Sequence, residues 1–211
     1  MSERSERISV TARSRSADRA KRGSAVSVMT SGIPHGRPFT VDDLEGFPDD
    51  GNRYELIDGM LLVSPAPSKR HQRNLFKLAI ALEMACPNDM LVLPAPFSVR
   101  PSKSTELQPD VLVARKSDFT EKLLPVAPLL AVEVFSPSSV INDLNNKKAA
   151  YERLGVACYW VVDPQQPAMM VFELGDDSRY QQVAEVKGSD AFEALRPFPV
   201  RIVPADLQDA D

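Results

Sequence analysis

The chain has 211 residues, of which 43% are hydrophobic and 26% charged, and its formal net charge at pH 7 is −4. This length and apolar content suffice for one domain with a substantial core. No apolar stretch approaches the ~20 residues of a membrane-spanning helix, and no secretory signal opens the chain, so we expect a cytoplasmic protein without a membrane partner. The two cysteines fit neither a zinc-ligand spacing nor a disulfide framework.

The charge is distributed unevenly along the chain. Residues 1–38 hold eight Arg and Lys against three acids, a balance of +5, which leaves −9 for residues 39–211. An acidic domain argues against non-specific adhesion to DNA over its whole surface, because such binding depends on counterion release by many basic side chains. A local basic groove remains compatible with this composition.

The first 37 residues are rich in Ser and Arg and nearly free of large apolar side chains. Such a segment cannot bury enough surface to offset its ordering entropy, so we predict a disordered tail over 1–37. It is either a basic arm that contacts nucleic acid or, as we favour, a solvated extension. A single folded domain is expected over 38–207, followed by a short tail over 208–211.

Folded structure is predicted to begin with a short helix capped by Thr40. A hairpin over 53–57 and 60–64 follows, because Asp58-Gly59 is a strong turn signal between two apolar runs. Glu55 lies on the first strand of this hairpin, on the face opposite its two neighbours. It is either exposed or a third acid at a site, and the local pattern favours exposure.

Apolar residues at helical spacing predict a helix over 69–86. Its polar face gathers four basic side chains, Lys69, Arg70, Arg73 and Lys77. A charged helix face is usually only solvated, but this one is the best candidate for contacts with phosphates, with Arg73 and Lys77 as candidate substrate contacts. His71 opens the helix, where a cap or surface role competes with contact to an anionic substrate.

Two segments are predicted to be strands buried on both faces. Each carries a carboxylate, which is not expected in a purely structural core. They are 108–114 with Asp110 and 129–135 with Glu133. An isolated carboxylate among apolar strands is costly unless it meets a cation. Asp110 and Glu133 could therefore hold a divalent metal if the fold brings them together.

A further helix is predicted over 140–154, with Gly155 as its C-cap. The side chain of Lys147, in the second turn of this helix, could reach the end of the strand that carries Glu133. Lys148 is predicted to be a solvated surface residue. The other predicted elements are an irregular strand over 90–99, a short helical connection over 116–123, a strand over 158–164, a hairpin of 169–174 with 180–186, and a last strand over 199–204.

Several motifs occur in an order that resembles the Uma-two family, which belongs to the PD-(D/E)XK nuclease superfamily. They are Arg53-Tyr-Glu-Leu-Ile-Asp-Gly59, Ser64-Pro-Ala-Pro67 followed by His71, Gln108-Pro-Asp110, Val132-Glu-Val-Phe-Ser-Pro137, Asp143 with Lys147 and Tyr151, and Gly155-Val-Ala-Cys-Tyr-Trp-Val-Val-Asp-Pro164. The resemblance covers roughly residues 38–207. No glycine-rich phosphate loop, Gly-x-Ser-x-Gly elbow or Cys/His dyad supports another enzyme class.

The resemblance implies an α/β fold, a mixed sheet flanked by helices, with a restriction endonuclease-like core and additional N-terminal and C-terminal β-hairpins. It also implies Mg²⁺, with Mn²⁺ as a substitute, held by Asp110 and Glu133. The usual lysine position two residues after Glu133 is Phe135, so the family's ammonium corresponds to Lys147 from the following helix. Glu55 is similar to an additional acid near the metal. A homodimer is an expectation by resemblance alone.

The function implied by this resemblance is that of a metal-dependent endodeoxyribonuclease, with Lys147 assisting the water that attacks a DNA phosphodiester. One alternative is a non-catalytic domain that keeps the fold and binds nucleic acid or a protein, which the acidic charge and the displaced lysine favour modestly. Another is a metal-dependent phosphoesterase acting on a different substrate. The choice between Lys147 and Lys148 as the active-site lysine stays open at this point.

Overall fold

The computed structural model describes residues 36–135 and 142–209. Most of the predicted tail over 1–37, and the first two residues of the helix predicted from 140, lie outside the described residues. In the described ranges, no helix is long and apolar enough to cross a membrane.

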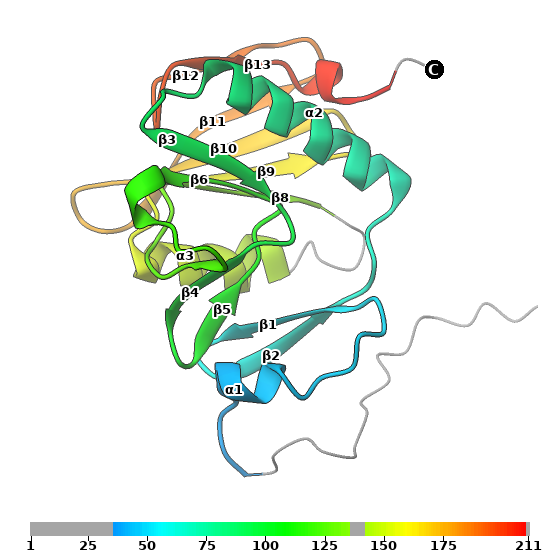
Figure 1. Ribbon diagram of the computed structural model, residues 1–211. Helices are drawn as coiled ribbons and strands as arrows, with labels where there is room; N and C mark the ends of the chain where they lie inside the picture. The colour runs from blue at the N-terminus through cyan, green and yellow to red at the C-terminus, as the bar shows by residue number, and fades with distance from the viewer. Residues whose placement is uncertain (1–35, 136–141, 210–211) are drawn as a thin grey trace, which may run out of the picture. The chain divides into compact units, whose positions relative to one another are not determined.

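Two larger β-sheets and one small sheet form the described part of the chain (Figure 1). The five-stranded sheet has the order β2-β1-β5-β4-β7, with β1 Arg53–Ile57, β2 Met60–Ser64, β4 Ser98–Ser102, β5 Thr105–Leu107 and β7 Leu123–Leu124. The six-stranded sheet has the order β11-β10-β9-β8-β6-β3, with β3 Met90–Pro94, β6 Val111–Arg115, β8 Leu130–Val134, β9 Cys158–Asp163, β10 Ala168–Leu174 and β11 Tyr180–Lys187. The small sheet pairs β12 Phe192–Ala194 with β13 Val200–Ile202.

The helices are short apart from one. They are α1 Val41–Leu44, α2 Lys69–Ala85 and α3 Lys148–Leu154, and α3 continues a turn of π-helix over Asn142–Lys147. Single 3₁₀ turns lie at Lys116–Asp118 and Pro204–Leu207. Because β8 and β9 are parallel while β6 and β8 are antiparallel, the central sheet is mixed, which confirms the predicted mixed α/β class.

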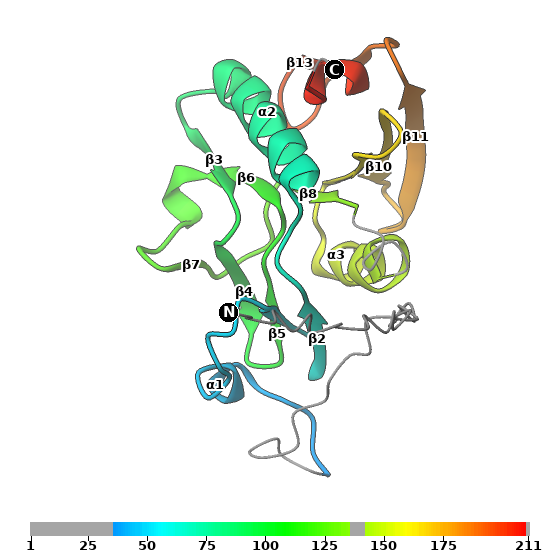
Figure 2. The ribbon, with the colours of Figure 1, turned by 90° about the vertical axis from the view of Figure 1, so that its right-hand side faces the viewer.

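The two faces of the six-stranded sheet carry different helices, as Figures 1 and 2 show. Side chains alternate along β8, so Leu130, Val132 and Val134 pack in the cluster that contains the buried leucines of α2. Ala131 and Phe135 pack in the cluster that contains Ala150 and Tyr151, on the side of α3. By the same alternation, the side chain at position 133 points towards α3.

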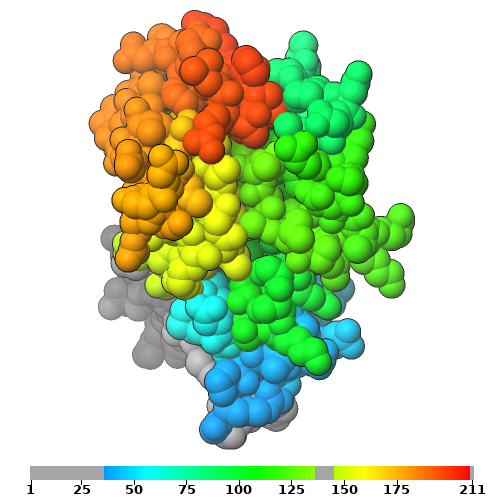
Figure 3. Space-filling view, turned by 90° about the vertical axis from the view of Figure 1, so that its left-hand side faces the viewer, coloured from blue at the N-terminus to red at the C-terminus, as the bar shows by residue number. Residues whose placement is uncertain are grey.

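The C-terminal segment completes the face that carries α2. Ala194, Phe198, Val200, Ile202 and Leu207 join the same core cluster as the leucines of α2. In Figure 3 the orange β10 and β11 and the red C-terminal segment lie beside one another on one surface. The C-terminal hairpin expected from the resemblance is therefore present as β10 and β11, with β12 and β13 added to it.

Two predicted elements differ from the structure. The single irregular strand predicted over 90–99 is two strands in different sheets, because β3 pairs with β6 while β4 pairs with β5. The prolines at 94 and 96 mark the break: the first half pairs with β6, which follows about 20 residues later, whereas β4 pairs with the strand that comes next in the chain. The helical connection predicted over 116–123 is one 3₁₀ turn followed by β7.

The hairpin of β1 and β2 has the predicted register, from Arg53 opposite Ser64 to Ile57 opposite Met60. Its turn residues, Asp58 and Gly59, have φ values of 51° and 81°, as a tight two-residue turn requires. A Cβ atom at position 59 would lie 2.5 Å from Cβ of Pro38.

Gly59→Ala is expected to destabilise the domain by roughly 1–3 kcal/mol, because it adds backbone strain and a steric clash. Gly51→Ala is the matched control, since Gly51 has the same φ of 81° but no atom within 4 Å of the position that a Cβ would take. Denaturant unfolding measures the loss of unfolding free energy in both variants. The loss in Gly51→Ala gives the backbone strain alone, and the additional loss in Gly59→Ala gives the steric clash with Pro38. An equal loss in the two variants would show that the contact with Pro38 is unimportant.

Candidate active site

The two larger sheets meet at the three residues that connect β5 to β6. The backbone N–H of Gln108 donates to Oε1 of Glu55 at 2.8 Å, and Nη1 of Arg53 donates to the carbonyl oxygen of Gln108 at 3.0 Å. Arg53 and Glu55 are two residues apart on β1, so both side chains lie on the same face of that strand. This face of the N-terminal hairpin is thereby fixed against the beginning of β6.

Asp110 immediately precedes β6 and continues its register with β8, in which Val111 lies opposite Val132. Its side chain is 2% exposed. Oδ2 accepts the backbone N–H of Val134 at 2.8 Å, and Oδ1 accepts Nη1 of Arg53 at 3.0 Å. Burial opposes the charged form, but contact with His71 and the charge of Arg53 outweigh it and lower the pKa of Asp110 to about 2. Asp110 is therefore ionised at neutral pH.

Lys147 lies between two buried carboxylates. Its Nζ is 3.1 Å from both carboxylate oxygens of Glu133 and 2.9 Å from Oε2 of Glu55. The three side chains are at most 2% exposed. Oε2 of Glu55 accepts no well-aligned hydrogen bond, so its contact with Lys147 is chiefly one of charge. The ammonium thus links the hairpin of the first sheet to the central strand of the second.

The hydroxyl of Tyr151, one helical turn after Lys147, donates to Oε1 of Glu133 at 2.9 Å. Its ring is completely buried. Burial and the neighbouring charges of Glu133 and Glu55 raise the pKa of Tyr151 well above its ordinary value. Tyr151 therefore remains a protonated donor that fixes the orientation of the Glu133 carboxylate.

The described part of the cluster contains more carboxylates than basic side chains. Among the contacts of the described residues, three carboxylates, of Glu55, Asp110 and Glu133, face two basic side chains, Arg53 and Lys147. The same negative carboxylates raise the pKa of Arg53, although burial opposes the increase. A buried excess of negative charge favours the binding of a further cation.

The donor atoms of this cluster suit a hard divalent cation. Asp110 and Glu133 both line one pocket and offer carboxylate oxygens, the ligands that Mg²⁺ prefers. Over the described ranges, no three His, Cys, Asp or Glu side chains are arranged to hold a metal by themselves. Mg²⁺ is commonly held by one or two carboxylates, with waters and substrate phosphates as its other ligands, so a pair of acids is sufficient.

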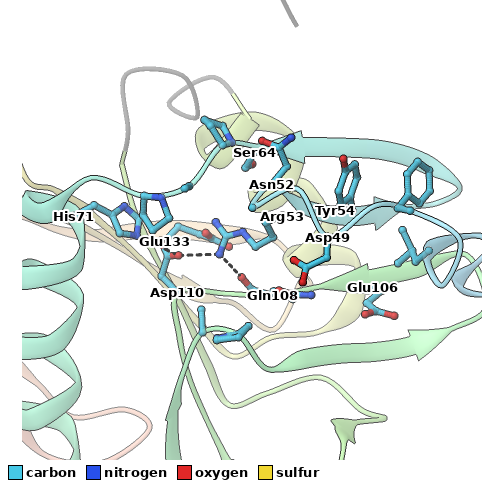
Figure 4. A pocket seen from close by; sticks show the side chains of 18 of the residues that line it. Asp49, Asn52, Arg53, Tyr54, Ser64, His71, Glu106, Gln108, Asp110 and Glu133 are labelled. Atoms are coloured by element: carbon cyan, nitrogen blue, oxygen red, sulfur yellow. Dashed lines mark hydrogen bonds and ion pairs between the residues drawn. The ribbon is translucent and has the colours of Figure 1, made fainter. Parts of the chain in front are cut away.

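The pocket has a volume of about 820 Å³ and extends well beyond the acids. In Figure 4, His71, Asp110 and Glu133 lie towards one end, with Arg53 and Gln108 in the middle. The segment from Pro65 to Ser68 and the first turn of α2 form part of its wall. A polymeric substrate could therefore approach the carboxylates from this side.

The structure brings together the three residues that the sequence placed at the centre of the site: Asp110, Glu133 and Lys147. The exposure that the local pattern favoured for Glu55 is wrong, because its side chain is completely buried against Lys147. The surface role favoured for His71 is also wrong: its side chain is 6% exposed and Nε2 lies 3.4 Å from Oδ1 of Asp110.

Two other basic candidates lie outside the pocket. Arg73 donates to both carboxylate oxygens of Asp209, and Nζ of Lys77 donates to the carbonyl oxygen of Gln208. These contacts fasten the C-terminal segment to α2. Lys148, read as solvated from the sequence, instead has its Nζ 3.8 Å from the ring centroid of Phe172 and does not reach the acids.

The sequence predicted no role at this site for Arg53 or for Tyr151. A signal was present for both. Arg53 is two residues before Glu55 on a strand, and Tyr151 is four residues after Lys147 on a helix, so each shares a face with a residue of the cluster.

The described residues thus form a mixed α/β domain with a buried cluster of acids and one lysine beside its pocket. Residues 41–206 match the model of the Uma2 family, described as "putative restriction endonuclease". Because this match covers most of the chain, the chain belongs to the Uma2 family.

Among solved structures, the chain is similar to a "putative nuclease" of the DUF820 family from Anabaena variabilis, with a TM-score of 0.63 and 17% sequence identity. The match covers 81% of this chain and 97% of that chain. At this identity the likeness shows the fold. No curated protein matches the chain.

Proposed function

We propose that the chain is an endonuclease that hydrolyses DNA phosphodiester bonds with Mg²⁺ as its cofactor and Mn²⁺ as a substitute. One observation carries the proposal: the carboxylates of Asp110 and Glu133 line one pocket, and the ammonium of Lys147 contacts both Glu133 and the buried Glu55 behind it. Membership of a family whose description is "putative restriction endonuclease" supports a nuclease activity. A purely structural ion pair would need neither the third carboxylate nor the pocket.

Asp110 and Glu133 would hold the metal, which when bound offsets charge on the phosphate and lowers the pKa of a coordinated water. Lys147 would position the attacking water and add positive charge beside the developing oxyanion. Glu55 anchors Lys147 from the opposite side, and Tyr151 fixes the rotation of Glu133. Each group is thus held by a contact that does not depend on substrate.

Arg53 and His71 hold Asp110 in its ionised form, because both contact Oδ1 of this carboxylate. His71 also lines the pocket beside the N-terminus of α2, where partial positive charge favours a phosphate. We therefore keep His71 among the candidate substrate contacts. Arg73 and Lys77 do not line this pocket and are paired with the C-terminal segment.

The test is cleavage of supercoiled and linear DNA by the purified full-length chain, with Mg²⁺, with Mn²⁺ and with EDTA. Nicking is expected with either metal and none with EDTA. In the absence of DNA, either metal at 100 times its dissociation constant should stabilise the fold by about 2.7 kcal/mol, seen as an increase in melting temperature.

The alternatives give different results in the same experiment. A folded protein that binds DNA, cleaves neither DNA nor RNA and shows no metal-dependent stabilisation would be a non-catalytic binding domain. Metal-dependent hydrolysis of small phosphoesters that excess DNA does not inhibit would indicate a phosphoesterase with another substrate.

A further inference from the structure

The pocket has a second end whose chemistry differs from that of the acid cluster. Figure 4 shows Asp49, Tyr54 and Glu106 at the end of the pocket away from His71. These side chains come from the turn before β1, from β1 itself and from β5. Nothing in the proposed hydrolysis uses them.

An aromatic pair forms part of this end. The ring centroids of Phe47 and Tyr54 are 4.8 Å apart and the ring planes are inclined by 22°, so the rings are stacked. The hydroxyl of Tyr54 donates to Oδ2 of Asp50 at 2.9 Å, which fixes the ring. Both rings are partly buried and line the pocket. A fixed aromatic surface of this kind is suited to stacking on a nucleobase.

The polar groups at this end suit a base better than a phosphate. The carboxylate of Glu106 is 6% exposed and pairs with Nε of Arg100 at 2.6 Å. Within 36–135 and 142–209, Asp49 has no hydrogen bond or ion pair, and it also lines the pocket. Carboxylates accept hydrogen bonds from the amino groups of bases, and they repel phosphates. The anionic backbone would therefore be disfavoured here.

We infer that Phe47, Tyr54 and Asp49 form a subsite for one unpaired nucleobase. The substrate that this subsite selects is a single strand, or a flap, with an unpaired nucleotide close to the bond that is cut. A base inside a continuous duplex is stacked on both neighbours and would have to be flipped out before it reached the pocket. The part of this inference that concerns cleavage rests on the proposed nuclease function, whereas base binding does not.

A fluorescent base tests the subsite directly. A thymidine oligonucleotide with a single 2-aminopurine is titrated with the full-length protein in Ca²⁺, and its fluorescence is expected to be quenched on binding. Tyr54→Phe should keep the quenching because the ring remains, whereas Tyr54→Leu and Phe47→Leu should lose it. Phe76→Leu is the matched control, because Phe76 is an exposed aromatic residue that does not line the pocket.

The affinity of the subsite is measured with the same oligonucleotide carrying an abasic site in place of the 2-aminopurine. The wild type should bind the abasic strand roughly tenfold more weakly, as expected for the loss of one stacked base. Tyr54→Leu should bind the two strands equally. Equal quenching in wild type and Tyr54→Leu, or equal affinity of the wild type for a continuous duplex and a single strand, would overturn the inference.

Cleavage of the single strand and of the matched duplex separates this inference from the proposed function. Faster cleavage of the single strand, lost in Tyr54→Leu, supports both. Equal cleavage of the two substrates without quenching overturns the base subsite and leaves the nuclease standing. Quenching without cleavage of either substrate supports the base subsite and overturns the nuclease.

Discussion

Glu133→Gln is expected to lower metal-dependent cleavage by about a thousandfold. A bound metal contributes several kcal/mol of transition-state stabilisation, and each 1.36 kcal/mol corresponds to about a factor of ten in rate. The substitution removes one of the two carboxylates proposed to hold that metal. Glutamine keeps the shape of the side chain and can still accept the hydroxyl of Tyr151, so the fold should survive.

The measurement is single-turnover cleavage beside calorimetric titration with Mn²⁺. Asp110→Asn should give the same loss of both rate and metal affinity. Glu173→Gln is the matched control, since Glu173 lies on β10 and pairs with Arg196 away from the pocket. Wild-type cleavage by Glu133→Gln would mean that the metal is held elsewhere and that Glu133 only pairs with Lys147.

Lys147→Met is expected to lower the free energy of unfolding by about 3–5 kcal/mol, the usual cost of breaking a buried ion pair by removing one partner. The methionine fills a similar volume, so the loss reflects charge. Glu55 and Glu133 would be left facing each other in a site where both are at most 1% exposed. Urea unfolding at pH 7 measures the effect, and cleavage should be lost as well.

A second substitution identifies the cause of this loss. In Lys147→Met combined with Glu55→Gln, one of the two carboxylates that face each other becomes neutral, so part of the stability should return without any return of cleavage. Lys148→Met is the matched control and should cost about 1 kcal/mol or less, the contribution of a cation over an aromatic ring. Equal losses in the two single variants would contradict the role given to Lys147 in the buried cluster.

The sequence predicted well what depends on local pattern. The hairpin of β1 and β2 has the predicted bounds because Asp58-Gly59 specifies both the turn and the register. The strands beside Asp110 and at Glu133 were recognisable from their continuous apolar runs. The two acids were recognisable as site candidates because an isolated carboxylate in an apolar run requires a partner. Lys147 was recognisable because its helix follows the Glu133 strand directly.

The environments of Glu55 and His71 could not be predicted locally, because each depends on a partner more than 35 residues away in sequence, Lys147 and Asp110 respectively. A strand residue opposite an apolar face normally points to solvent. Here that face is covered by the segment between β5 and β6 and by the lysine before α3. Arg53 was given no role for the same reason, because its partners, Gln108 and Asp110, are more than 50 residues away in sequence.

The hydrogen bonds between β1 and the residues before β6 limit how far this domain can be shortened from its N-terminus. A chain that began at Pro65 would retain the whole six-stranded sheet, both candidate metal-binding acids and Lys147. It would nevertheless lack Arg53 and Glu55, which hold Asp110 and Lys147 in place. The N-terminal hairpin is thus an integral component of the candidate active site, and any shortened chain used to test the proposed cleavage must include it.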